Sequence, residues 1–292
     1  MSDMIDQIEP TEATHVAAPR KKSGRRVLGL MAIVLAALYA FPFAMVILNS
    51  VKERRTVISD PLGVPSPFKW DNFTEAIDKM GYWQALLNTF IVTVISVSAI
   101  IVTSSMLAYY LARTKSKFST TTFLVLVASM VVPFQALMIP FVGFFLRDLS
   151  FPANQYTIAF FYVGFGVALS TFLYHGFISN IPISLDEAAA IDGAGPIMTF
   201  RTVVFPLLGP VTATVAIINT LWIWNDYLLP SLVLVENDEK TIPLRTFVFF
   251  GQYTSDYGLA MAGLLLSIVP IVVFYFMMQK RIIAGISAGA VK

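Results

Sequence analysis

The sequence contains no cysteine and only two histidines, His15 and His175, among its 292 residues. Without cysteine there is no disulfide, no catalytic thiol and no cysteine-ligated metal. A metal site or a histidine general base would need the two histidines to act together with carboxylates, and a lone histidine on an apolar helix is ordinarily a packed one. We therefore predict no metal site, no resident cofactor and no catalytic residue in this chain.

Charge is also scarce. Only 13% of the residues are charged while 57% are hydrophobic, and the mean hydropathy is +0.73. A net charge of +2 is too small to indicate a nucleic-acid partner. The pattern G-x-x-x-x-G-K-[ST] is absent, which excludes a P-loop ATP site in this chain. This composition is that of an integral membrane protein rather than a soluble domain.

Six apolar runs have the length needed to cross a bilayer as helices. They are continuously apolar, whereas the strands of a membrane barrel alternate, so we predict an all-α membrane domain over residues 27–292. Pro133 and Pro140 predict a kink in the third run. The runs cover residues 27–48, 86–111, 123–145, 156–178, 207–229 and 259–278.

The distribution of basic residues predicts that both termini are cytoplasmic. In that orientation twelve of the 20 Lys and Arg residues fall on the cytoplasmic side, and "RKKSGRR", "ARTKSK" and "QKR" directly flank membrane runs. The "KERR" of Lys52 to Arg55 argues the other way. Residues 1–26 turn from acidic to basic before the first run, which predicts a disordered cytoplasmic tail on an uncleaved signal-anchor.

The stretch "SLDEAAAIDGAG", from Ser184 to Gly195, is acidic on the side where basic residues are expected. Ser184 and Glu187 have the spacing of a capping box, the alanines favour a helix, and Gly193 predicts its end. Pro196 can start a second helix. A helix of two turns is marginal in water, so it either packs on the membrane helices of its own chain or docks on a soluble partner.

The segment "EAAAIDGAGPIMTFRTVVFPLLGP" resembles the EAA loop of binding-protein-dependent ABC importer permeases. The family pattern is matched at Glu187, Ala188, Ala189, Gly193 and Pro206. The segments "FPFAMVILNSVKE", "LNTFIVTVISVSA", "AYYLAR", "WIWNDYLLP" and "AGISAGAVK" are similar to those of maltose-type carbohydrate permeases.

This resemblance implies a type I ABC importer permease fold with six transmembrane helices, in which a cytoplasmic coupling helix lies between the fourth and fifth. The EAA loop spans about residues 180–206. The implied partners are a second, homologous permease, a cytoplasmic ATPase dimer that binds ATP and Mg, an extracytoplasmic sugar-binding protein, and a sugar, with an oligosaccharide favoured. The implied location is the inner membrane of a bacterial or archaeal cell. The residues implied in ATPase coupling are Glu187, Ala188, Ala189, Asp192, Gly193 and Pro206.

Residues that contact the sugar are less clearly marked. Aromatic and polar side chains gather in "WIWNDY", where they suit stacking on sugar rings or, equally, the interfacial belt of a membrane protein. Two further polar residues line the pathway or bond to neighbouring helices. The predicted pathway set is Asn88, Gln135, Trp222, Trp224, Asn225, Asp226 and Tyr227. The alternatives are a permease of this class for another solute, such as a glycerol phosphate or an amino acid, and a secondary transporter. The latter usually carries buried ion-coupling charges, which these runs almost lack.

Overall fold

The computed structural model describes residues 22–249 and 256–290, with side chains described for 27–249 and 256–279. Most of the predicted disordered tail, residues 1–21, lies outside the described residues. The chain divides into two compact units, residues 1–45 and 46–292. In the first unit the helix α1 (Lys22–Ser50) begins; it is strongly apolar from Val27 onward and includes Pro42. The last five residues of α1 belong to the second unit.

The regular structure of the described residues is helical throughout, as predicted. Short π-helical turns occur at Phe144–Asp148 and Phe200–Val204, and short 3₁₀ turns at Asn237–Glu239 and Phe247–Phe249. The helices of the second unit are α2 (Arg54–Ser59), α3 (Asp71–Met80), α4 (Tyr82–Arg113), α5 (Lys117–Ser129), α6 (Phe134–Gly143), α7 (Gln155–Ile178), α8 (Ser184–Ile191), α9 (Pro196–Thr199), α10 (Phe205–Leu207), α11 (Gly209–Asn225), α12 (Leu228–Val233), α13 (Ile242–Thr246) and α14 (Tyr257–Ala290).

Four of the described helices are long and apolar enough to cross a membrane unbroken, and two bent pairs bring the total to six if each pair counts as one span. The unbroken segments correspond to the first, second, fourth and sixth predicted runs. They are Val27–Ser50, Tyr82–Arg113, Gln155–Ile178 and Tyr257–Gln279.

The predicted third run, residues 123–145, is broken into two helices, a sharper change of direction than the kink that Pro133 and Pro140 predict. Lys117–Ser129 and Phe134–Asp148 meet at 101°. The break falls at Pro133, whose backbone is extended (φ −64°, ψ 120°), because proline lacks an N–H and pushes the residue before it away from helical geometry. The predicted kink is therefore at Pro133, while Pro140 lies within α6.

The predicted fifth span, residues 207–229, corresponds to α11, which is shorter. Here α11 ends at Asn225 because Asp226 is extended (ψ 129°), and the preceding segment Pro196–Leu207 is bent by 79° from α11. Gly209 and Pro210 restart the helix after this bend, and the proline lies in the first turn, where its missing N–H costs nothing.

Two apolar cores hold the second unit together. The larger joins α4, α7 and α11 through residues such as Ile100, Phe161 and Val215, all less than 5% exposed. At Gly166 a methyl group would lie 2.5 Å from Ile100 Cδ1 and 2.9 Å from Asn219 Oδ1, so this glycine permits the close approach of the three helices. The smaller core joins α3, the first turns of α4, and α14, with α3 in contact with both of the other helices.

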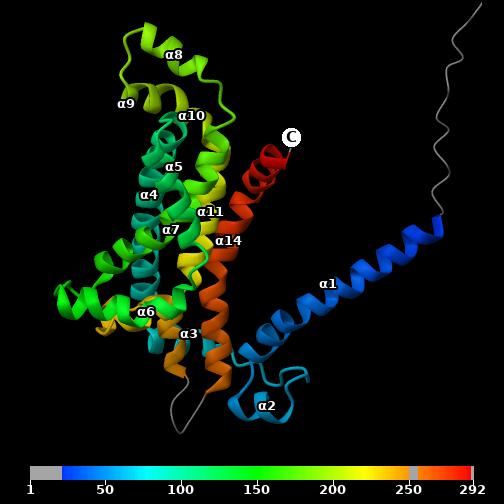
Figure 1. Ribbon diagram of the computed structural model, residues 1–292. Coiled ribbons are helices and arrows are strands. Elements are labelled where there is room, and N and C mark those ends of the chain that lie inside the picture. Colours follow the sequence, from blue (N-terminus) through cyan, green and yellow to red (C-terminus); the bar gives the residue numbers. More distant parts are fainter. Residues whose placement is uncertain (1–21, 250–255, 291–292) are drawn as a thin grey trace, which may run out of the picture. The chain divides into compact units, whose positions relative to one another are not determined.

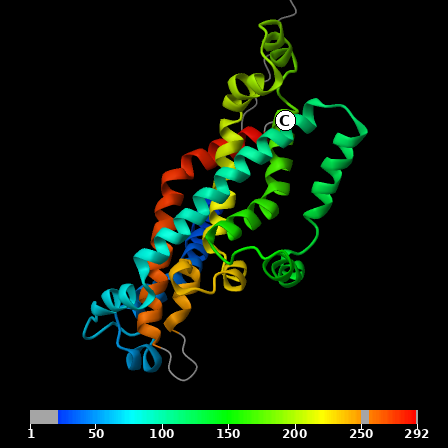
Figure 2. The same ribbon diagram turned by 90° about the vertical axis from the view of Figure 1, so that its left-hand side faces the viewer.

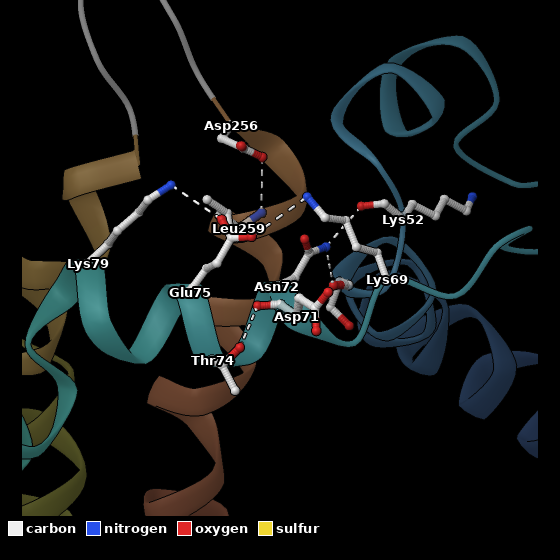
Figure 3. Close-up of polar contacts among 10 residues, drawn as sticks. Lys52, Lys69, Asp71, Asn72, Thr74, Glu75, Lys79, Asp256 and Leu259 are labelled. Atoms are coloured by element: carbon white, nitrogen blue, oxygen red, sulfur yellow. Dashed lines mark hydrogen bonds and ion pairs between the residues drawn. The ribbon is translucent and has the colours of Figure 1, made fainter.

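Polar contacts fasten α3 to the end of α1 and to the segment that follows it (Figure 3). The buried Asn72 amide donates to the carbonyls of Ser50 (2.8 Å) and Lys52 (2.9 Å). The Lys52 ammonium, itself buried, donates to the carbonyls of Asp60 (2.9 Å) and Pro61 (3.0 Å). These bonds supply donors to backbone carbonyl groups that are not paired within a helix.

Replacement of Asn72 by leucine is expected to destabilise the domain, because it leaves two buried carbonyl groups without a donor. Each such loss costs about 1–3 kcal/mol. In a domain of this size 1 kcal/mol shifts the midpoint by about 2–4 °C, so the apparent melting temperature of the purified protein, measured at one heating rate, should fall by at least about 4–8 °C. Thr74→Ala, which removes an exposed bond on the same helix, is the control and should change little. An Asn72→Leu protein with the same melting temperature as the wild type would contradict this role.

Candidate functional site

The predicted EAA loop forms an arm at one end of the second unit. Figures 1 and 2 show α8 and α9 beyond one end of the helices α4, α7 and α11, with α3 at the opposite end. The C-terminal part of α14 runs toward the end that carries α8. The loop is therefore well separated from the α3 region.

Helix α8 begins differently from the prediction. Ile183 precedes it with helical backbone angles (φ −64°, ψ −23°), and no side chain caps the helix. The N–H groups of Asp186 and Glu187 both donate to the carbonyl of Ile183, at 2.9 and 3.1 Å. Ser184 is therefore inside the helix rather than extended before it, and the predicted capping box does not form. The acidic first turn, Asp186 and Glu187, is present and complements the helix dipole.

The end of α8 follows the prediction. Gly193 adopts φ +82°, a left-handed conformation that favours glycine. Its N–H donates to Ala190 O (3.0 Å), and the N–H of Ala194 donates to Ala189 O (2.9 Å), the two bonds of a Schellman motif. Pro196 then begins α9. Gly193 thus reverses the chain between the two helices without leaving the carbonyls unpaired.

The two acidic side chains of the first turn differ in their surroundings. Asp186 is turned toward α4 and is bonded there to Tyr109 and Arg113. Glu187 is exposed and makes no ion pair among the described side chains. Of these two acids, only Glu187 is thus free to contact another molecule.

Most of the other predicted coupling residues and their neighbours on α8 and α9 are small or apolar. Ala188 and Asp192 are exposed, while Ala189 is 9% exposed and packs inward. Large apolar side chains are exposed on α8 and α9: Ile191 (87%), Ile197 (74%) and Met198 (59%). Pro206 is exposed beyond the π-helical turn. An arm that exposes apolar residues together with the carboxylates of Glu187 and Asp192 is suited to a protein contact rather than to catalysis.

The predicted pathway residues do not form one cluster. Asn88 is buried, and its amide donates to the carbonyls of Asp238 (2.6 Å) and Lys240 (3.1 Å). It thereby holds the loop after α12 against α4. Gln135 is exposed in the first turn of α6.

The "WIWNDY" residues point in different directions. Trp224 is 8% exposed, and the exposed Asn225 donates its amide to Leu221 O (2.7 Å). The Asp226 carboxylate accepts from the buried Tyr162 hydroxyl at 2.9 Å. Tyr227 packs on Phe247, with 4.4 Å between ring centroids. Trp222 meets Tyr162 edge-on and lines a cavity.

This cavity measures about 610 Å³ and lies between the α5–α6 break, α7 and α11. Its lining includes Pro133, Phe134, Gly166, Asn219 and Trp222. The sequence prediction missed Asn219, although an amide in the middle of an apolar run is a signal of function. The amide donates to Ser170 Oγ (3.1 Å) and Val215 O (2.8 Å). The volume falls within the range of small-molecule sites. No three His, Asp or Glu side chains in the described ranges gather as a metal site requires.

Residues 100–287 match the family described as the binding-protein-dependent transport system inner membrane component. The matched region covers more than half of the chain, including the whole arm from α8 to α10. The chain belongs to this family. It is accordingly a permease, the membrane component of an ABC importer, and not an enzyme; in this family the ATPase is a separate subunit.

Relatives of this permease match along almost their whole length. The probable starch degradation products transport system permease protein AmyC of Thermoanaerobacterium thermosulfurigenes is 41% identical over 266 residues, covering 91% of this chain and 96% of AmyC. The melibiose/raffinose/stachyose import permease protein MelC of Bacillus subtilis is 36% identical over 277 residues, covering 94% of this chain and 99% of MelC. A chain in the crystal structure of a bacterial ABC transporter involved in the import of alginate aligns with a TM-score of 0.75 at 23% sequence identity. The alignment covers 90% of this chain and 99% of that chain. That likeness supports the importer permease fold.

Proposed function

We propose that this permease forms half of the translocation pathway of an ATP-driven importer for sugars, with an oligosaccharide as the first candidate. The substrate class is supported by the relatives AmyC and MelC, whose names specify starch degradation products and melibiose, raffinose and stachyose. The observation that carries the mechanism is the arm of α8 and α9, which presents a free Glu187 and exposed apolar side chains in a chain without a P-loop.

In this proposal α8 is the coupling helix, and it docks in a cleft of a cytoplasmic ATPase that binds ATP and Mg. Glu187 pairs with a basic group of the ATPase, and Ala188 and Ala189 permit close approach. Gly193 sets the reversal into α9, and Asp192 and Pro206 complete the loop. Closure of the ATPase dimer then moves the arm and switches the access of the pathway. A second, homologous permease supplies the other half, and an extracytoplasmic binding protein delivers the sugar.

The proposed orientation places both termini and α8 on the cytoplasmic side of a bacterial or archaeal inner membrane. Lys52 is the first charge of the opposing "KERR" segment, and its ammonium is buried against two carbonyl groups. It therefore serves the local structure rather than the charge bias of a loop. The C-terminal part of α14 also runs toward the end that carries α8 (Figures 1 and 2).

Within the pathway we propose Trp222, together with Asn219, as the best-placed sugar contacts. An aromatic face and an amide beside a cavity are the combination that stacks on a sugar ring and bonds its hydroxyls. Asn225 and Gln135 are exposed and remain available to the pathway. Asp226 and Tyr227 are held by Tyr162 and Phe247, and Asn88 and Trp224 are buried, so we assign these four to supporting the pathway wall.

The test is uptake by the complete complex reconstituted in vesicles, with the ATPase, the second permease and the binding protein. We expect uptake only with ATP and Mg, and stimulation of ATP hydrolysis by a binding protein loaded with oligosaccharide. Stimulation by glycerol phosphate or an amino acid instead would replace the substrate class. Uptake driven by an ion gradient without ATP would indicate a secondary transporter and overturn the proposal.

A further inference from the structure

Three side chains join α8 to the end of α4, and together they are called the α4–α8 clamp: Tyr109, Arg113 and Asp186. Tyr109 and Arg113 are one turn apart and share a face of α4. The Tyr109 hydroxyl donates to Asp186 Oδ1 at 2.7 Å, and Arg113 Nη2 donates to Asp186 Oδ2 at 2.9 Å. Both carboxylate oxygens are therefore engaged by a single face of α4.

The clamp also reaches the end of α7. Arg113 Nη2 donates to Ile181 O at 3.1 Å, and Nη1 lies 3.4 Å from Ile178 O. The ion pair is largely shielded from water, with 16% of the Arg113 side chain and 14% of the Asp186 side chain exposed. On its other side the Tyr109 ring packs against Phe200, 5.3 Å between centroids, in the turn after α9. Tyr109 and Arg113 of α4 thus contact the segment before α8, α8 itself and the turn after α9.

We propose that Tyr109, Arg113 and Asp186 are positioning residues that make α8 move as one body with the last turn of α4. This inference rests on the proposed coupling function of α8. Helix α8 has only eight residues, of which Ala189 alone is buried, so packing gives it little hold of its own. A shielded ion pair is costly to break from one side, because the remaining charge is left without its partner. A push on the arm is therefore transmitted into α4 instead of being absorbed by the loop.

Helix α4 is suited to carry that movement. It has 32 residues without a break, and at its other end Asn88 holds the loop that contains Asp238 and Lys240. The clamp thus connects the arm with the opposite end of the domain through one continuous helix. The clamp gives the two acids of the first turn different roles. Asp186 is bound within the permease by α4, whereas Glu187 stays free to contact the ATPase.

The guanidinium of Arg113 is specific for this role. Its planar fork reaches a carboxylate and backbone carbonyls together, whereas the single ammonium of a lysine cannot keep that arrangement. We therefore expect Arg113→Lys to retain the charge and the assembly of the complex but to lose part of the coupling.

The experiment measures coupling in the reconstituted complex rather than activity alone. Tyr109→Phe, Arg113→Gln and Asp186→Asn are compared with the wild type by yield of complex, ATP hydrolysis stimulated by loaded binding protein, and sugar transported per ATP hydrolysed. The matched controls are Tyr110→Phe and Lys115→Gln, which change exposed neighbours at the same end of α4. We expect Asp186→Asn and Arg113→Gln to lower the sugar transported per ATP about tenfold, a usual size for coupling between sites, and the controls to leave it unchanged.

A double variant separates the clamp from a general effect on folding. Asparagine at position 186 can still accept a hydrogen bond from Tyr109, so the double variant uses Asp186→Ala, which leaves Tyr109 and Arg113 no acceptor there. Tyr109→Phe combined with Asp186→Ala should lower the sugar transported per ATP no more than Asp186→Ala alone. If the Arg113→Gln permease fails to assemble into the complex, the sugar transported per ATP by Tyr109→Phe tests the proposal instead. That variant removes one hydroxyl and keeps the ring against Phe200.

The inference is overturned if these variants reduce only the yield of complex and keep the wild-type ratio of sugar to ATP. It is also overturned if the double variant lowers that ratio by the sum of the losses of its two single variants. In that event ATP-driven uptake by the wild type still supports the proposed function. If the wild-type complex itself shows no ATP-driven uptake, the proposed function fails, and the clamp proposal falls with it.

Discussion

Replacing Glu187 by lysine is expected to abolish uptake while leaving the permease in the membrane. Glu187 is exposed in the first turn of α8, and Asp186 beside it is already engaged by α4. The change therefore reverses the one free charge that the first turn of this arm offers to a basic group on the ATPase. Truncating one partner of a close charge pair at an interface costs about 2–5 kcal/mol, and a reversal adds repulsion. Uptake should fall at least about a hundredfold, the factor that corresponds to 2.7 kcal/mol.

Co-purification and ATP hydrolysis distinguish this effect from misfolding. The Glu187→Lys permease should reach the membrane at wild-type levels, yet retain less ATPase on purification or fail to pass on stimulation by the binding protein. Asp71→Lys is the matched control, because Asp71 is also an exposed acid in the first turn of a short helix, and α3 lies at the opposite end of the domain. Wild-type uptake by Glu187→Lys would contradict the assignment of α8 as the coupling helix.

Features encoded by neighbouring residues were predictable from the sequence. The helix Ser184–Ile191, its end at Gly193 and the restart at Pro196 depend on propensity and backbone sterics over a dozen residues, and the structure has all three. The number of apolar runs was likewise readable, because hydropathy reports length and composition. Hydropathy does not report continuity, however. The break at Pro133 had a local signal, but its 101° angle depends on how α5 and α6 pack.

Features that depend on distant residues could not be predicted. Ser184 and Glu187 have the spacing of a capping box, yet the chain enters α8 through a turn at Ile183, and Asp186 is held by residues more than 70 positions earlier. The sequence marks Asn88 as a pathway candidate, but its bond to the loop at Asp238 forms only when that loop is folded against α4. The cavity beside Asn219 and Trp222 likewise exists only because two helices, α7 and α11, converge with the α5–α6 break there. In each case the deciding partner is remote in the sequence.

Gly193→Asp is expected to disrupt coupling through the backbone alone. A side chain at Gly193 would meet no atom within 4 Å, so nothing clashes with it. The residue has φ +82°, and an L-residue in the left-handed region costs roughly 1–2 kcal/mol. That cost falls on the reversal that sets α8 against α9 and closes the two bonds of the Schellman motif. We expect the membrane helices to fold normally and uptake to fall at least about tenfold, because the arm no longer holds the geometry in which it docks.

Gly195→Asp is the matched control for Gly193→Asp. It introduces the same charge two residues away, also into open space, but Gly195 has φ −74° and precedes the first residue of α9. Aspartate is favoured at such a helix-capping position, so this variant should be tolerated or slightly stabilising. Uptake and ATPase retention are measured for both variants at equal amounts of permease. Equal losses would mean that the added charge matters and the left-handed turn does not; normal uptake by Gly193→Asp would mean that the reversal after α8 has no part in coupling.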